Sequence, residues 1–205
     1  MRPAILFPGQ ASQRVGMGSD FFDEYDIVRE VFHSADEAIG QKLSSLILEG
    51  PDEELTLTAN AQPAILTVSY AIWLVASKFL EGGSVCAFAG HSLGEYSALV
   101  AAGALDFSDA VRLVRLRGTF MQETVPAGQG KMAAVIGLSP GVVDEVLRSI
   151  DLHGEVAQVA NLNSPEQIVI SGTSAGIDAC FEPLISAGAR KVVELKVSAP
   201  FHCSL

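Results

Sequence analysis

The sequence predicts an α/β protein with a larger body and a smaller inserted domain. Strand-like apolar runs and helical segments fill the first 127 residues, and a compact β-α-β-β-α-β succession follows them. The chain has 205 residues, of which 49% are hydrophobic and 18% are charged, so it can bury a core of the size this requires. We assign residues 1–127 and 198–205 to the body and residues 128–197 to the insert.

The body opens with a short strand. Residues 4–7 are apolar and end at Pro8-Gly9, which predicts a buried strand entering a loop. A second strand, 84–89, consists of small and apolar residues and feeds a parallel sheet. Apolar spacing, terminal glycines and the capping residue Ser108 predict the helices. These helices cover residues 23–38, 62–79, 93–102 and 108–125.

The insert has a regular order of elements. Its predicted strands are 132–138, 156–160, 167–171 and 190–197, and its helices are 140–150 and 174–187. Pro140 suits the first turn of its helix, whereas Pro183 lies inside the second helix and is expected to bend it. The order β-α-β-β-α-β is typical of a ferredoxin-like fold.

Composition narrows the possible functions. The net charge of −11 argues against nucleic-acid binding, which calls for a basic surface. The most apolar stretch, 61–80, is interrupted by polar residues and predicts a buried helix rather than a membrane span. The apolar run at the start of the chain is too short for a signal peptide. The three cysteines show no metal-ligand spacing, and we expect reduced thiols in a cytoplasmic protein.

Ser92 is the leading candidate nucleophile. It is the centre of Gly90-His-Ser-Leu-Gly94, which follows a predicted strand and opens a predicted helix, as in a nucleophile elbow. A tight turn of this kind exposes the serine hydroxyl beside the first N–H groups of the helix, which can stabilise an oxyanion. The alternative is a glycine-rich turn with a capping serine and no catalytic role.

Arg117 is the second informative position. Helical spacing places it in the middle of an apolar face formed by Leu113, Val114, Phe120 and Met121. A guanidinium in such a place needs an anion. Either a protein carboxylate or a substrate carboxylate would satisfy it, and the helix alone favours neither.

His202 is the best candidate base by elimination. His33 and His153 fall on segments that we expect at the surface, and His91 is expected to point away from its neighbour Ser92 in the tight turn. His202 follows the last predicted strand, in Ala199-Pro-Phe-His202. A lone histidine is otherwise often structural.

Five segments together resemble the malonyl-CoA:acyl-carrier-protein transacylase family, which is related to the acyltransferase domains of fatty-acid and polyketide synthases. They occur in the order of the family and span essentially the whole chain. They are Phe7–Gln13, Gly90–Ala98, Arg117–Gln122, Asn161–Pro165 and Ala199–His202.

The resemblance implies a hydrolase-like α/β body with a ferredoxin-like insert and a role for each matching residue. Ser92 would be the nucleophile and His202 its base, the backbone N–H groups of Gln10 and Leu93 would form the oxyanion hole, and Arg117 would hold the malonyl carboxylate. The substrates would be malonyl-CoA and acyl carrier protein, with no metal or separate cofactor. Members of the family that accept malonyl tend to have phenylalanine at the position of Phe201, which would line the acyl pocket unless its ring packs into the core.

Two departures from the family pattern bear on these roles. Ala11 stands where the family usually has glycine, which affects the loop of the oxyanion hole. The chain also stops three residues after His202, whereas the family continues with further body elements, so we expect that the C-terminal part is lacking.

Two other functions compete with malonyl transfer. A serine esterase or thioesterase would use water in place of the carrier thiol, and would need an acidic residue to orient the histidine; Asp144, Asp151 and Asp178 fall in the right interval. A truncated chain that binds carrier protein or coenzyme A without turnover is the non-catalytic alternative.

Overall fold

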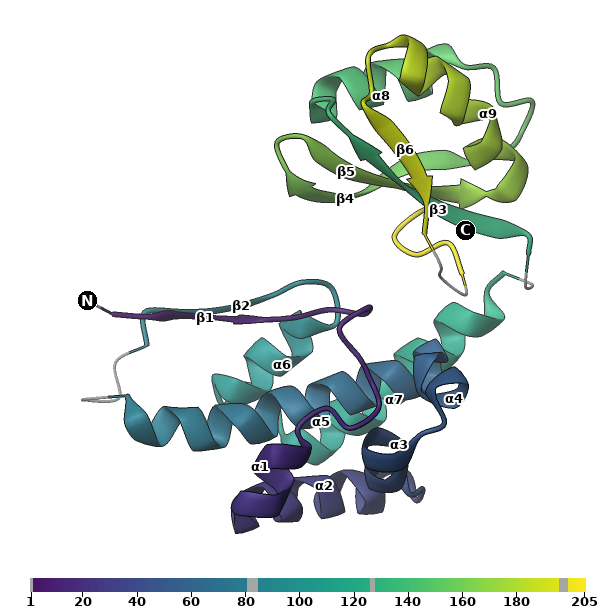
Figure 1. Cartoon of the computed structure of the whole chain (residues 1–205). Coiled ribbons are helices and arrows are strands. Elements are labelled where there is room, and N and C mark those ends of the chain that lie inside the picture. Colours follow the sequence, from purple (N-terminus) through teal and green to yellow (C-terminus); the bar gives the residue numbers. More distant parts are fainter. Residues whose placement is uncertain (1, 81–84, 126–127, 196–198) are drawn as a thin grey trace. The chain divides into compact units, whose positions relative to one another are not determined.

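The chain forms two compact units, Met1–Phe120 and Met121–Leu205. The structure is a computed structural model that describes residues 2–80, 85–125, 128–195 and 199–205 (Figure 1).

The first unit contains a pair of parallel strands, β1 (Ala4–Phe7) and β2 (Ala87–Gly90), as the sequence predicts. Of the predicted second strand, Ser84 lies outside the described residues. The register aligns Phe7 with Gly90, so the loops that leave the carboxyl ends of both strands begin side by side. This is the usual place for a site in an open parallel sheet.

Helices make up the rest of the first unit. They are α1 (Ser19–Glu24), α2 (Asp26–Ile39), α3 (Leu43–Glu49), α4 (Asp52–Thr56), α5 (Thr58–Ala76) with the 3₁₀ turn η1 (Ser77–Phe79), α6 (Gly94–Ala101) and α7 (Phe107–Glu123), whose last three residues fall in the second unit. The long helix α5 passes between the strand pair and α2 (Figure 1). Helices α1, α3 and α4 were not predicted, because they are too short to show a helical period in the sequence.

Helix α5 is the central core helix of the first unit. By length and composition alone, Thr58–Phe79 would pass as a membrane span, yet 56% of its apolar 18-residue stretch is buried inside the structure. Its buried residues include Ile65, Leu66 and Ala71, which pack with Phe32 of α2. The helix also buries polar Gln62, which matters for the site.

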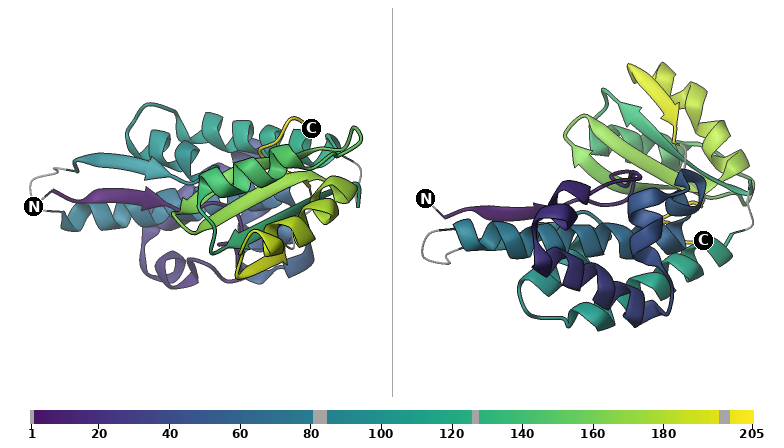
Figure 2. Two further views of the ribbon diagram at one scale, coloured as in Figure 1. Left: turned by 90° about the horizontal axis from the view of Figure 1, so that it is seen from above. Right: turned by 60° about the horizontal axis from the view of Figure 1, so that its bottom comes forward.

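The second unit has a four-stranded antiparallel sheet in the order β4-β5-β3-β6. The elements follow the predicted β-α-β-β-α-β order: β3 (Gly130–Ile136), α8 (Pro140–Ser149), β4 (Ala157–Ser164), β5 (Gln167–Thr173), α9 (Ser174–Ser186) and β6 (Lys191–Glu194). Both helices cover one face of the sheet, as the two views of Figure 2 show, and bury Val135, Ile170 and Ile177 between the layers. The predicted last strand runs on to residue 197, and its final two residues lie outside the described residues.

The opposite face of this sheet carries the end of the chain. Ala199 and Phe201 pack against Met132 and Val169, and the Ser204 N–H donates to Gln158 Oε1 at 2.8 Å. Residues 199–205 thus pack within the second unit, and their assignment to the body stays a prediction.

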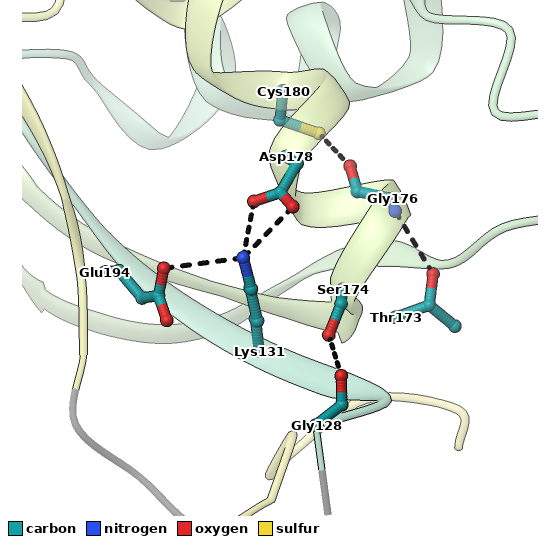
Figure 3. A network of polar contacts seen from close by, with 8 residues as sticks. All are labelled: Gly128, Lys131, Thr173, Ser174, Gly176, Asp178, Cys180 and Glu194. Atoms are coloured by element: carbon teal, nitrogen blue, oxygen red, sulfur yellow. Dashed lines mark hydrogen bonds and ion pairs between the residues drawn. The ribbon is translucent and has the colours of Figure 1, made fainter.

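Polar contacts join β3, β6 and α9 (Figure 3). The Lys131 ammonium donates to both carboxylate oxygens of Asp178, at 2.8 and 3.0 Å, and lies 3.5 Å from Glu194 Oε2. The hydrogen bond with Asp178 is the main reason that the pKa of Lys131 is raised. Nearby, the Thr173 hydroxyl accepts from the Gly176 N–H at 3.2 Å and caps α9.

Candidate active site

The turn at Ser92 has the geometry of a nucleophile elbow. Ser92 adopts φ +51°, a left-handed conformation that non-glycine residues rarely take. A Cβ on Gly90 would lie 1.9 Å from the Gly94 carbonyl carbon, and a Cβ on Gly94 would lie 2.3 Å from the Phe7 carbonyl oxygen. Both glycines are therefore required so that β2, the turn and α6 can pack against β1.

The loop after β1 lies against this turn. The His91 N–H donates to the Phe7 carbonyl at 3.1 Å, and a Cβ on Gly9 would lie 2.6 Å from the His91 carbonyl oxygen. The loop therefore brings Gln10 to the end of the sheet where Ser92 sits. Ala11 has φ +75°, so the residue that departs from the family pattern is held in a conformation that favours glycine.

Two backbone donors near the turn are without an acceptor in the described ranges of the chain. Within the described part of the chain, neither the Gln10 N–H nor the Leu93 N–H donates a hydrogen bond to another residue. Leu93 itself is fully buried and precedes the first turn of α6. Unpaired N–H groups beside a helix N-terminus are suited to an oxyanion.

Arg117 reaches Ser92 from α7. Its Nη2 donates to Ser92 Oγ at 3.0 Å, its Nη1 donates to Gln62 Oε1, and its guanidinium carbon lies 5.7 Å from the centre of the Tyr96 ring. Partial burial lowers the pKa of Arg117, an effect that Tyr96 opposes. A guanidinium pKa is normally far above neutrality, so Arg117 remains a cation.

No carboxylate pairs with Arg117 among the residues that the structure describes. Of the two explanations left open by the sequence, this observation favours a carboxylate from a ligand. The predicted surroundings were wrong in one respect, because Leu113 and Phe120 are 44% and 61% exposed. Val114 is buried as predicted, and the other buried residues of α7 are Ala110, Val111 and Gly118.

His202 and Phe201 belong to the second unit, whereas Ser92 and Arg117 belong to the first. His202 is exposed and has φ +59°. The Phe201 ring is 9% exposed and contacts the apolar cluster on the sheet face. The pairing of Ser92 with His202 and a pocket role for Phe201 stay predictions.

The acidic residues that an esterase would need are engaged elsewhere. Asp178 binds Lys131, Asp144 forms an ion pair with Arg148 at 2.8 Å, and Asp151 lies 3.3 Å from His153. Each of these contacts is on the surface of the second unit. The described residues contain no cluster of three or more histidine, cysteine, aspartate or glutamate side chains that could hold a metal ion.

Gln62, Tyr96 and Gly118 were not predicted as parts of the site. Gln62 and Arg117 are 55 positions apart, and nothing local in the sequence connects them. One signal was present, since Gln62 is one of the polar residues that interrupt the apolar stretch 61–80.

The chain is similar to known acyltransferases. Residues 5–204 match the acyl transferase domain family. The malonyl CoA-acyl carrier protein transacylase of Bacillus subtilis (strain 168) is 53% identical over 98% of this chain and 63% of its own length.

Two solved structures are similar over nearly the whole chain. An acyl carrier protein S-malonyltransferase from Vibrio cholerae has a TM-score of 0.92 and 44% identity, and covers 98% of this chain and 65% of its own. A type II PKS acyl-carrier protein in complex with its malonyl-transacylase matches with a TM-score of 0.94 and 42% identity, over 100% of this chain and 65% of that one.

The chain thus spans about two thirds of the length of these relatives. The match to the family extends over almost all of its residues and includes the elbow, Arg117 and the segment that ends at His202. The chain therefore belongs to the acyl transferase domain family.

Proposed function

We propose that this chain carries the acyl-transfer site of a malonyl-CoA:acyl-carrier-protein S-malonyltransferase. The observation that supports this most directly is the position of Arg117, a partly buried cation with neutral partners that donates to Ser92 Oγ at 3.0 Å. A cation so close to a nucleophile is suited to an acyl group that ends in a carboxylate, as malonyl does. The relatives whose names specify malonyl transfer support the same choice.

The reaction proceeds in two transfers through an acyl-serine. Ser92 Oγ attacks the thioester carbonyl of malonyl-CoA while His202 takes the hydroxyl proton. The Gln10 and Leu93 N–H groups stabilise the oxyanion of the tetrahedral intermediate. The C–S bond then breaks, and the coenzyme A thiolate receives the proton from His202.

The second transfer reverses these steps with a different thiol. The phosphopantetheine thiol of acyl carrier protein loses its proton to His202 and attacks the acyl-serine carbonyl, which releases Ser92. No separate cofactor takes part, because the thioester is already the activated donor. Arg117 holds the malonyl carboxylate in both transfers, and Phe201 lines the acyl pocket beside the malonyl α-carbon.

The proposed fold is a hydrolase-like α/β body, residues 1–127 and 198–205, with a ferredoxin-like insert at 128–197. The order of strands in the second unit and the elbow in the first support this division. We place the protein in the cytoplasm, where acyl carrier protein and malonyl-CoA would be its partners. An esterase is less well supported, because its candidate acidic residues bind surface cations.

Brief incubation with labelled malonyl-CoA tests the proposal. Label should appear on the peptide that contains Ser92 and disappear in Ser92→Ala. In Arg117→Ala, malonylation should fall by about 30-fold or more relative to acetylation from acetyl-CoA, because a charge-assisted pair in a dry site contributes about 2–5 kcal/mol. Label that survives in Ser92→Ala would contradict the nucleophile, and no label in the wild-type chain would favour the non-catalytic alternative.

A further inference from the structure

Gln62 is a fully buried polar side chain, and both the nitrogen and the oxygen of its amide form hydrogen bonds. Its Nε2 donates to Thr58 Oγ1 at 3.0 Å, and its Oε1 accepts from Arg117 Nη1. The reversed amide would direct its NH₂ group at the guanidinium, donor against donor. The contacts with Thr58 and Arg117 therefore fix the orientation of the amide.

The backbone brings α7 unusually close to Gln62. Gly118 lies against the first turn of α5, where a Cβ would come within 2.6 Å of the Thr58 carbonyl oxygen. Pro63 lacks an N–H, so the Ala59 carbonyl has no partner four residues on in the helix. Arg115 Nη1 donates to that carbonyl at 2.9 Å and joins α7 to α5 two residues before Arg117.

A neutral partner has a particular consequence for the guanidinium. An acidic side chain at position 62 would orient Arg117 equally well but would also neutralise it, and a carboxylate ligand would then have to compete with a fixed ion pair. Gln62 holds the same nitrogen and leaves the positive charge uncompensated. Among the residues that the structure describes, the other contacts of Arg117 are the Ser92 hydroxyl and the Tyr96 ring, which are neutral as well.

We propose that Gln62 is a positioning residue that sets the acyl specificity of the site. It fixes the Arg117 guanidinium beside Ser92 and leaves the positive charge of Arg117 available to pair with the terminal carboxylate of the acyl group. The identity of the substrate in this inference rests on the proposed function, but the contact between Gln62 and Arg117 can be tested without any substrate.

The contact is tested by a double-mutant cycle on unfolding. Gln62→Met, Arg117→Met and the double variant should show a coupling that changes the unfolding constant by at least about threefold. Arg112→Met is the matched control, because Arg112 lies on the same helix but binds Asp109 and the Ala38 carbonyl. Its cycle with Gln62→Met should show no coupling. Equal coupling in both cycles would overturn the inference.

The specificity role is tested with Gln62→Glu, which differs by one atom. Malonylation and acetylation of the Ser92 peptide are measured from an equimolar mixture of malonyl-CoA and acetyl-CoA. The malonyl-to-acetyl ratio should fall at least about tenfold in Gln62→Glu, and less in Gln62→Met. An unchanged ratio in Gln62→Glu, with a clear malonyl preference in the wild type, would overturn the role of Gln62 alone. The lack of any malonyl preference in the wild type would instead refute the proposed function, and the specificity role with it.

Discussion

The close approach of α7 to α5 can be tested by adding a single methyl group. In Gly118→Ala the new Cβ would lie 2.6 Å from both the Ala59 Cα and the Thr58 carbonyl oxygen. An ordinary contact begins near 3.4 Å, so the deficit is about 0.8 Å. Both contacted atoms belong to the backbone and cannot rotate away, so the helices themselves must separate.

The expected cost follows from two opposing terms. Overpacking of this kind costs about 1–3 kcal/mol, and the rigid neighbours favour the upper half of that range. Replacing a helical glycine with alanine returns about 1 kcal/mol through helix propensity. Gly118→Ala should therefore destabilise the first unit by about 1–2 kcal/mol.

Gly141→Ala is the matched control for this substitution. Gly141 lies in the first turn of α8, where a new Cβ would meet no atom within 4 Å, so the same change should be neutral or stabilise the second unit by up to about 1 kcal/mol.

The assay exploits the single tryptophan of the chain. Trp73 lies on α5, with its ring 5.1 Å from that of Phe88, and its fluorescence reports the unfolding of the first unit. The thermal midpoint of the tryptophan signal should fall by about 3–10 °C in Gly118→Ala and stay unchanged in Gly141→Ala. Circular dichroism, to which the helices of both units contribute, follows the unfolding of the whole chain. A Gly118→Ala variant as stable as the wild type would refute the close packing on which the position of Arg117 depends.

Four further outcomes are expected. Phe201→Ser should raise methylmalonyl transfer relative to malonyl transfer by about 5–100-fold if the ring lines the pocket, and an unchanged ratio in a folded variant would place the pocket wall elsewhere. Ala11→Gly should leave the free energy of unfolding unchanged or raise it by up to about 1 kcal/mol, because φ +75° suits glycine; a loss in urea titrations would contradict this. Because the pKa of Lys131 is raised in the folded protein, its ion pairs stabilise the fold fully below the ordinary lysine pKa of about 10.4 and lose this effect as the pH rises through the higher folded value. The difference in free energy of unfolding between wild type and Lys131→Met should therefore disappear only above about pH 10. Burial raises the pKa of Cys180 to about 11, so at pH 8 a thiol reagent should modify the exposed Cys86 and reach Cys180 only after unfolding; equal rates in the native protein would contradict its burial.

Local chemistry explains what the sequence could predict. The elbow is encoded within five residues, since the two glycines and the turn that they permit are neighbours in the chain. The order of elements in the second unit was also predictable, because each strand and helix carries its own period and its own end signals.

Long-range packing explains what the sequence could not predict. The spacing of residues on α7 defines an apolar face, but not which side of the helix the rest of the fold covers, and so Leu113 and Phe120 were wrongly expected to be buried. Gln62 could not be linked to Arg117 because their contact depends on how two helices dock. The distance from Ser92 to His202 likewise depends on how two units are arranged, which no local pattern specifies.

The proline in α5 links two positions that are far apart in the chain. Pro63 removes the N–H that would donate to the Ala59 carbonyl from four residues on, and Arg115 supplies a donor in its place. Any other residue at position 63 would restore that N–H, and the Ala59 oxygen would then no longer depend on Arg115, whereas beside Pro63 the loss of Arg115 would remove the replacement donor. Substitutions at the two sites should therefore be accepted together more readily than singly, and sequences diverging from this one should show covariation between positions 63 and 115. A redesign of this helix pair would have to change Pro63 and Arg115 together.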